Sequence, residues 1–233
     1  MTIGWRITKV LLVEQKLSRI EEALHKTLDQ IAPESHQTAV TNDRSAQIVA
    51  PLRTLIERGG KRWRALFMQL TCEMYGGGDR VLPLTPLVEL AHAGSLIIDD
   101  IEDGARTRRG GPAAHIEFGI DLAVNAGNLA YFLPTKLLEP SSPTSPSITA
   151  AESLVLYRMY ATAMQKLHCG QGLDILWHQQ KTNLPSIADY LSMSTLKSGS
   201  LAGLAMGIGA TVAKAGEHLA TSLTTIGERF GVS

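Results

Sequence analysis

An apolar helix that ends in a cluster of carboxylates constrains this sequence more than any other feature. Apolar side chains recur at helical spacing through residues 87–98, and no proline follows Pro86 to interrupt them. The pattern then ends in four acids, which are Asp99, Asp100, Glu102 and Asp103. A helix C-terminus already carries partial negative charge, so clustered carboxylates there repel one another unless a positive group lies between them. The pattern therefore predicts a bound cation at this end of the helix.

The spacing of the acids favours Mg²⁺ as that cation. Asp99 and Asp103 are four residues apart and share a helix face, and Asp100 lies one turn from Asp103. Proteins typically hold Mg²⁺ with one or two carboxylates, together with waters and substrate phosphates. The alternative is that the acids form a solvated helix end, balanced by the basic residues nearby.

The residues around the acids indicate a site for a phosphorylated ligand. Arg106, Arg108 and Arg109 follow directly, an arrangement that suits a diphosphate bridged to the carboxylates by a metal ion. His92 lies seven residues before Asp99, two turns along the same face, which suggests that this face lines a cavity. Taken alone, His92 would more often be a hydrogen-bonded core histidine.

The composition favours an all-α protein with no general affinity for nucleic acid. The 233 residues include 22 Lys and Arg against 22 Asp and Glu, so the formal net charge is zero. Ala, Leu and Gly are common and strand-like alternation is scarce. The two thiols, Cys72 and Cys169, argue against a disulfide framework and fit a reducing, cytoplasmic location. We expect no signal peptide and no integral membrane segment, because residues 201–213, the longest apolar stretch, are too short to span a bilayer.

Helical patterns cover most of the chain. We predict one or two helices over residues 3–31, followed by a polar loop over 32–44. Further helices are predicted over 46–57, 61–74, 87–103, 122–138 with a kink at Pro134, 151–177, 186–193, 201–213 and 217–230. The helix over 46–57 is expected to begin near Pro51, and Ser186 with Asp189 predicts a helix cap. Residues 140–146 are a proline-rich surface loop or linker. Helices of the same kind follow it, so we expect a single domain over residues 1–233.

Four short motifs resemble those of the trans-isoprenyl diphosphate synthases, also called polyprenyl synthetases, from about residue 52 onward. Residues 59–64 read GGKRWR and resemble the family's GGKR-x-R motif. Residues 99–103 read DDIED and precede RRG at 108–110, which is similar to the first aspartate-rich motif, DDxxD. Residues 170–174 resemble the GQ-x-x-D element, and residues 197–199 resemble the KTG element with Ser in place of Thr. Each motif is short, but all four in this order are highly specific.

This resemblance implies an isoprenoid-synthase-type helical bundle around a deep central cavity, usually as a homodimer. It also implies a prenyltransferase that joins isopentenyl diphosphate to an allylic diphosphate by Mg²⁺-dependent head-to-tail (1′-4) condensation, giving an (E)-polyprenyl diphosphate. Ionisation puts full negative charge on the departing diphosphate, so a metal and arginines are needed where that charge develops. The implied catalytic residues are Asp99, Asp100, Asp103, Arg108, Lys197 and Gln171, with the three aspartates as ligands of Mg²⁺ over the allylic diphosphate.

Substrate-binding residues follow from the same resemblance, and they are Lys61, Arg64, His92, Arg109 and Asp174. Asp174 is expected beside the allylic diphosphate with Gln171, and the other four are expected to form the isopentenyl diphosphate site. Lys61 and Arg64 are three residues apart at an expected helix start, so both should point the same way beside free backbone N–H groups. Alone, Lys197 is typical of a surface lysine, and Gln171 with Asp174 is typical of an ordinary helix-face pair.

Small residues below the acids predict a long product. Gly94 and Ser95 lie one turn before Asp99, where a bulky side chain would leave no room for another prenyl unit. In the family that the motifs resemble, small residues here accompany products longer than farnesyl, so we expect C20 or longer. The floor of the cavity is then expected further down, near residues 87–88 or 129–132.

One feature of the resembled family is missing. Its second aspartate-rich motif, near an FQ-x-x-D-D-x-x-D pattern, would follow the region where this chain stops, and residues 200–233 contain no substitute. We expect a truncated version of a longer enzyme rather than a short inactive homologue. Two other functions stay open, a non-catalytic regulatory subunit of a prenyl diphosphate synthase and a class I terpene cyclase, although a cyclase would not need an isopentenyl site.

Overall fold

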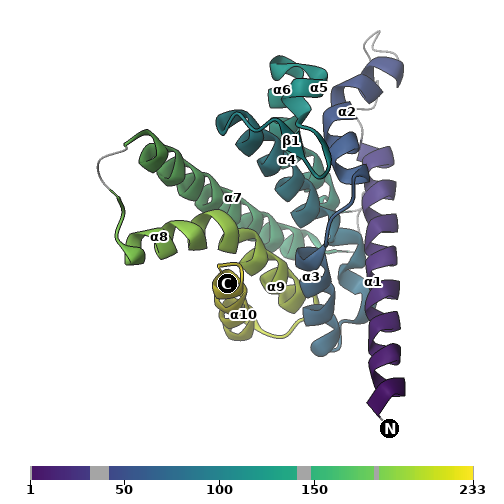
Figure 1. The fold of residues 1–233 in the computed structure, drawn as a ribbon. Helices are drawn as coiled ribbons and strands as arrows, with labels where there is room; N and C mark the ends of the chain where they lie inside the picture. Colours follow the sequence, from purple (N-terminus) through teal and green to yellow (C-terminus); the bar gives the residue numbers. More distant parts are fainter. Residues whose placement is uncertain (1, 32–41, 141–147, 181–183, 233) are drawn as a thin grey trace. The chain divides into compact units, whose positions relative to one another are not determined.

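Helices make up almost all of the described chain, as predicted. The structure, a computed structural model, describes residues 2–31, 42–140, 148–180 and 184–232. The α-helices are α1 (Thr2–Ile31), α2 (Asn42–Glu57), α3 (Trp63–Met74), α4 (Pro86–Glu102), α5 (Ala114–Phe118), α6 (Ile120–Phe132), α7 (Ala150–Gln179), α8 (Ile187–Ser194), α9 (Ser200–Val212) and α10 (Glu217–Phe230) (Figure 1). Two 3₁₀ segments, η1 (Gly78–Leu84) and η2 (Leu133–Leu138), and one π-helical turn, η3 (Thr195–Gly199), complete the helical part. The strands described are β1 (Thr107–Arg108) and β2 (Gly111–Pro112), a short antiparallel hairpin. The prediction of an all-α fold is confirmed.

The chain divides into two compact units. The first unit comprises Met1–Leu66 and Leu82–Lys136, and the second comprises Phe67–Val81 and Leu137–Ser233. The expectation of a single domain over residues 1–233 stays a prediction, and so does the deep central cavity. The two units are described separately below.

Helix α4 is the centre of the first unit. It packs against α6 and also contacts α1, α2 and α5. Its apolar face is fully buried, including Leu87, Leu90 and Ile97, and burial of each such side chain stabilises the fold by about 1.5–3 kcal/mol. Pro86 occupies the start of the helix, where its missing N–H costs nothing, and Asp103 is the C-terminal cap. The carboxylate-rich end of this helix is therefore held by a buried apolar stem.

Helix α2 begins earlier than predicted. It starts at Asn42, so Pro51 lies inside the helix rather than at its start, and residues 42–44 are helical rather than part of a loop. Pro51 and its neighbours Val49, Leu52 and Leu55 are buried. Packing of this apolar face outweighs the local cost of a proline within a helix. The remainder of the predicted loop, 32–41, and most of the proline-rich segment 140–146 lie outside the described residues.

The second unit is built on small residues of α9. This helix packs against α10 and α7, and η3 contacts α7, α8 and α10. The predicted cap at the start of α8 is confirmed, because the Ser186 hydroxyl accepts the Asp189 N–H at 3.1 Å and the Asp189 carboxylate bonds back to the Ser186 N–H. Thr149 and Glu152 form a second capping box at the start of α7.

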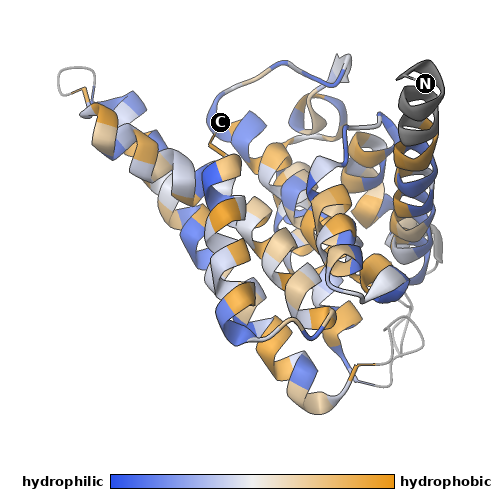
Figure 2. Ribbon diagram, turned by 90° about the horizontal axis from the view of Figure 1, so that it is seen from below, coloured by the Kyte–Doolittle hydropathy of each residue, from blue (hydrophilic) through white to orange (hydrophobic). Residues whose placement is uncertain are grey.

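One stretch of the described residues passes a test of length and composition for crossing a bilayer. It is Gly78–Glu102, which joins η1 to α4, and 67% of its most apolar window is buried inside the structure. Core helices of globular proteins meet the same criterion. Figure 2 shows apolar and hydrophilic residues interleaved along the coloured part of α1. The absence of a membrane segment stays a prediction.

Candidate functional site

Arg62 shapes the loop between α2 and α3. Gly59 and Arg62 both have positive φ angles, +81° and +48°, and the Arg62 side chain is buried. Its Nε donates to Glu21 Oε1 at 2.8 Å and its Nη2 donates to the carbonyl of Ile56 at 2.9 Å. Helix α3 starts at Trp63, so the prediction that Lys61 belongs to that helix is wrong. The left-handed residue between Lys61 and the helix is the reason, since it turns the chain before the first helical residue.

Arg58, at the end of α2, forms hydrogen bonds to the β-hairpin. The hairpin turns at Arg109 and Gly110, which have φ angles of +50° and +75°, as a type I′ turn requires at both central positions. The Arg58 Nη1 donates to the carbonyl of Pro112 at 2.6 Å and to that of Arg108 at 3.3 Å. Its Nη2 pairs with Glu117 at 2.5 Å.

Arg109 makes the reverse connection from the hairpin to α2. Its Nη1 donates to the carbonyl of Leu55 at 3.1 Å and to that of Gly59. Carbonyls at a helix C-terminus have no partner within the helix, so a guanidinium there satisfies them. We call Arg58 and Arg109 the arginine cross-brace, because each reaches from one of the two loops to the backbone of the other.

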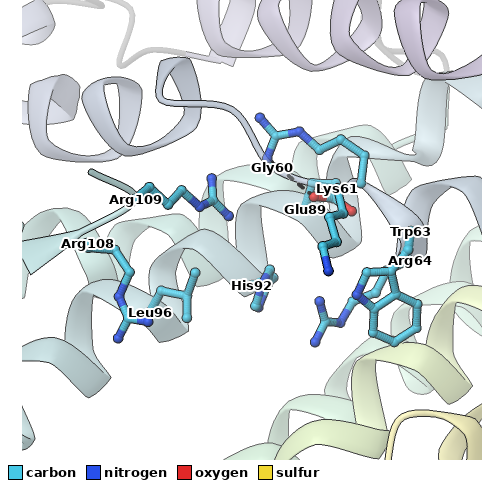
Figure 3. Close-up of a pocket in the computed structure, with 10 residues that line it drawn as sticks. Gly60, Lys61, Trp63, Arg64, Glu89, His92, Leu96, Arg108 and Arg109 are labelled. Carbon is cyan, nitrogen blue, oxygen red and sulfur yellow. Dashed lines mark ion pairs between the residues drawn. The ribbon is translucent and has the colours of Figure 1, made fainter. Parts of the chain in front are cut away.

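These two loops and α4 line an open pocket of about 420 Å³ within the first unit, shown in Figure 3. We call it the cation pocket, and it is lined by Gly60, Lys61, Arg62, Trp63, Arg64, Glu89, His92, Leu96, Arg108 and Arg109. Five of these side chains are cationic and one, Glu89, is a carboxylate. In Figure 3, Lys61, Arg64 and Arg109 point toward the space beside His92, whereas the Arg108 guanidinium points away from it. The fork geometry of arginine suits phosphate oxygens, so the pocket fits a diphosphate.

Arg64 is poised to bind an anion. Its guanidinium carbon lies 4.4 Å from the centre of the Trp63 ring, which fixes its orientation through a cation–π contact. Its Nε is buried and has no hydrogen-bond partner. Burial lowers the pKa of Arg64. The negative charge of Glu89 opposes this effect, and the positive charge of Arg109 adds to it. A ligand oxygen in the pocket would satisfy the buried Nε.

His92 is neutral at physiological pH. Burial lowers its pKa well below 6.5, and the positive charges of Arg64, Arg109, Arg62 and Arg108 lower it further. A neutral imidazole has one donor and one acceptor nitrogen, so it offers a hydrogen bond to a phosphate oxygen without adding charge.

The carboxylates at the end of α4 do not form a ready three-aspartate site. Asp100 is 1% exposed, and Arg108 Nε donates to its Oδ1 at 2.8 Å. Arg108 Nη2 also lies 3.5 Å from Asp99 Oδ2, and the hydrogen bond to Asp100 raises the pKa of Arg108. Asp99 is partly exposed beside Arg108, and Asp103 is exposed. Their oxygens, one turn apart, fit a hard cation.

A metal role for Asp100 therefore stays a prediction. Within the described ranges, no three or more His, Cys, Asp or Glu side chains are grouped so that they could hold a metal ion. Arg108 lies beside Asp99 and Asp100 as the partner of a buried carboxylate, and its expected contact with the allylic diphosphate stays a prediction.

The expectation that Gly94 leaves open space below the acids is wrong. A Cβ atom on Gly94 would lie 2.7 Å from the carbonyl oxygen of Gly127 and 2.8 Å from Cβ of Ala130, both in α6. Gly94 thus lets α4 and α6 approach closely, and the side chain of Tyr131 covers the same place. Ser95 is partly exposed and its hydroxyl donates to the carbonyl of His92 at 2.8 Å. A role for Ser95 in chain length stays a prediction.

The remaining predicted residues lie together in the second unit. Lys197 Nζ donates to Asp174 Oδ2 at 2.5 Å, and His178 Nδ1 lies 3.4 Å from the other oxygen of Asp174. Lys197 belongs to the π-helical turn η3, a rare geometry that often marks functional sites. Gly170 allows this approach, because a Cβ there would collide with the backbone of Lys197. Gln171 lies beside them on α7, and the relation of this group to the acids of α4 stays a prediction.

Sequence reasoning missed Glu89, Arg58 and Trp63. Glu89 carried a signal, since it is a carboxylate in an otherwise apolar helix, three residues before His92. Trp63 lies inside the GGKRWR motif but has no distinctive spacing. Arg58 carried no signal, because its partners lie 50 to 59 residues further along the chain.

Comparison with known proteins assigns the family. A sequence profile of the polyprenyl synthetases matches residues 45–233. The geranylgeranyl pyrophosphate synthase of Eremothecium gossypii is 34% identical over 183 residues, 78% of this chain and 56% of that protein. The geranylfarnesyl diphosphate synthase of Aeropyrum pernix is 35% identical over 182 residues, 77% of this chain and 56% of that protein. The chain thus spans little more than half the length of these relatives.

A solved structure agrees with this assignment. The geranylgeranyl pyrophosphate synthetase of Pyrococcus horikoshii superposes with a TM-score of 0.77 and 26% identity, covering 94% of this chain and 64% of that one. The all-α fold and the family indicated by the four motifs are therefore confirmed. The chain belongs to the polyprenyl synthetase family.

Proposed function

We propose that this chain carries the substrate-binding part of a trans-prenyltransferase that condenses isopentenyl diphosphate with an allylic diphosphate. The observation that carries the proposal is the cation pocket, which adjoins the carboxylates of α4 through Arg108. The relatives named above are synthases of geranylgeranyl and geranylfarnesyl diphosphate, which supports a product of C20 or longer. A second diphosphate site also favours this function over a terpene cyclase, because a cyclase binds a single diphosphate substrate.

The residues of the cation pocket are proposed to bind isopentenyl diphosphate. Lys61, Arg64 and Arg109 supply charge-assisted hydrogen bonds to its phosphate oxygens, and neutral His92 supplies a further hydrogen bond. Arg64 and Arg109 are partly buried from water, which strengthens their contacts, and the contacts together fix the orientation of the substrate.

The allylic diphosphate is proposed to bind at the end of α4. Asp99 and Asp103 would hold Mg²⁺ there, and the ion would neutralise the diphosphate as it leaves. Arg108 lies beside Asp99 and adds positive charge to the same place. Lys197, Gln171 and Asp174 are proposed to contact this substrate too, which the motif resemblance supports.

Two further properties are proposed for the whole protein. Exposed apolar side chains on α6, which include Ile120 at 56% and Phe132 at 70%, support a homodimer. The free thiols of Cys72 and Cys169 support a reducing, cytoplasmic location. Light scattering after size-exclusion chromatography tests the first, since a mass of one chain contradicts the dimer.

Product analysis of the protein expressed from its complete gene tests the function. It is incubated with labelled isopentenyl diphosphate, Mg²⁺ and dimethylallyl, geranyl or farnesyl diphosphate in turn, and the products are separated by length. We expect elongation to C20 or beyond, abolished by Asp99→Ala and retained in Asp121→Ala, which removes an exposed carboxylate of α6. A folded protein that elongates none of the three starters would contradict the proposal and favour a non-catalytic subunit.

A further inference from the structure

Glu89 is a buried carboxylate that no step of the proposed reaction uses. It lies on α4, and only 3% of its surface is accessible to solvent. It is the one acidic side chain among the residues that line the cation pocket. Unpaired carboxylates are rarely buried to this extent. Its position therefore requires a physical explanation.

Each oxygen of Glu89 contacts a different part of the pocket. Oε2 lies 3.6 Å from Nη1 of Arg62, and Oε1 accepts the backbone N–H of Ala65 at 3.3 Å. Ala65 belongs to the first turn of α3, where backbone N–H groups and the helix dipole favour negative charge. The helix start that the sequence predicts to be free for a ligand is therefore already contacted by a protein carboxylate.

Glu89 offsets positive charge in the pocket that the other described carboxylates do not cover. Arg108 pairs with Asp100 and Arg62 pairs with Glu21, but Lys61, Arg64 and Arg109 line the same pocket of about 420 Å³, and their mutual repulsion opposes folding. The pKa of Glu89 is raised, because burial outweighs the opposing effects of Arg62, Arg64, the Ala65 N–H and Arg109. Arg62 does not depend on Glu89 alone, because Glu21 and the carbonyl of Ile56 also hold it.

We propose that Glu89 is the internal counterion of the cation pocket, which stabilises the arginine cluster before a diphosphate enters and weakens the binding of that diphosphate. The inference rests on the proposed function of the pocket as a diphosphate site. Glu89 is a positioning residue, because its contacts are with Arg62 and the start of α3. Its negative charge repels a bound diphosphate through a poorly screened interior, so the empty pocket gains stability and the occupied pocket releases its ligand more readily.

The substitution Glu89→Gln separates charge from shape. The amide keeps the length of the side chain and an oxygen that can accept the Ala65 N–H, but it carries no charge. Binding of inorganic pyrophosphate is measured by calorimetry on the complete protein, at low ionic strength and with EDTA to exclude metal-dependent binding. We expect Glu89→Gln to bind pyrophosphate about tenfold more tightly. We also expect a lower melting temperature without anion and a larger upward shift when pyrophosphate is added.

Two further variants control for net charge and for packing. Glu22→Gln makes the same charge change on an exposed residue of α1, and its pyrophosphate affinity is expected to be unchanged. Glu89→Asp keeps the charge but shortens the side chain, and it is expected to bind within about twofold of the unsubstituted protein. Tenfold tighter binding by Glu89→Asp would show that shape rather than charge controls affinity, and the proposal would be overturned even if Glu89→Gln did not fold.

The outcomes distinguish this inference from the function on which it rests. Equal pyrophosphate affinities in Glu89→Gln and the unsubstituted protein would overturn the counterion and leave the diphosphate site intact. A folded, unsubstituted protein that does not bind pyrophosphate would overturn both.

Discussion

Replacing Gly94 with alanine should destabilise the first unit even though alanine is the better helix former. The added Cβ would lie 2.7 Å from the carbonyl oxygen of Gly127, and real Cβ contacts below 3.0 Å essentially never occur. Backbone of α6 must therefore move by at least 0.3 Å, which is 3.0 minus 2.7, and Cβ of Ala130 at 2.8 Å must move with it.

The expected magnitude follows from two opposing contributions. The helix propensity of alanine contributes about 1 kcal/mol in favour of the folded state. Overpacking against a rigid neighbouring backbone costs about 1–3 kcal/mol. We expect the free energy of unfolding to fall by up to about 2 kcal/mol, which is measurable by urea denaturation followed by circular dichroism.

Gly172 provides the matched control. It lies inside α7, its φ angle is not positive, and a Cβ on it would meet no atom within 4 Å. Gly172→Ala should therefore stabilise the protein by about 0.4–1 kcal/mol. If Gly94→Ala stabilised the protein as much as Gly172→Ala, the close packing of α4 on α6 would be refuted, and open space at Gly94 would again be a reasonable interpretation.

Three other predictions test the rest of the arrangement by urea unfolding. Arg58→Lys keeps the charge but cannot reach all three partners, so the free energy of unfolding should fall by about 1.5–3 kcal/mol. Arg53→Lys, the control at an exposed single ion pair, should lower it by less than about 1 kcal/mol. Equal losses in the two variants would contradict the cross-brace. The pKa of His92 is depressed in the folded state, so below pH 6.5 the unfolded chain takes up a proton that the folded protein does not. The free energy of unfolding should therefore fall more in the unsubstituted protein than in His92→Gln between pH 7.5 and 5.5. Parallel declines in the two proteins would contradict a buried neutral ring. Gly170→Ala should cost about 1–3 kcal/mol because its Cβ meets the backbone of Lys197, and an unchanged midpoint would contradict that contact.

Helices with an uninterrupted apolar period were predictable from the sequence. Helix α4 follows its pattern from Pro86, α10 has the predicted bounds, and the cap at Ser186 is formed. The start of α2 was not predictable by the same rules. A proline is read locally as a helix start, but the cost of Pro51 within a helix is outweighed by apolar contacts that come from elsewhere in the chain.

In the site, too, local sequence patterns predicted some residues, whereas contacts between distant parts of the chain could not be predicted. Lys61, Arg64, His92 and Arg109 line one pocket, as the motifs indicated. The sequence does not show that Glu89 faces them, because this depends on how α4 meets the loop before α3. A small residue such as Gly94 is compatible with open space or with a close helix contact, and only the neighbouring helix decides between them.

The arginine cross-brace also has a consequence for the order in which the first unit folds. Its hydrogen bonds join residues 50 to 54 positions apart, so the intervening chain must close into a loop at an entropic cost of about 3.5 kcal/mol for fifty residues. We expect such contacts to form late, because the long loop must close first, whereas the helices have local contacts and form early. Pyrophosphate would then bind only molecules in which these contacts have formed, and at a hundred times its Kd it would lower the unfolded fraction by adding about 2.7 kcal/mol to the free energy of unfolding.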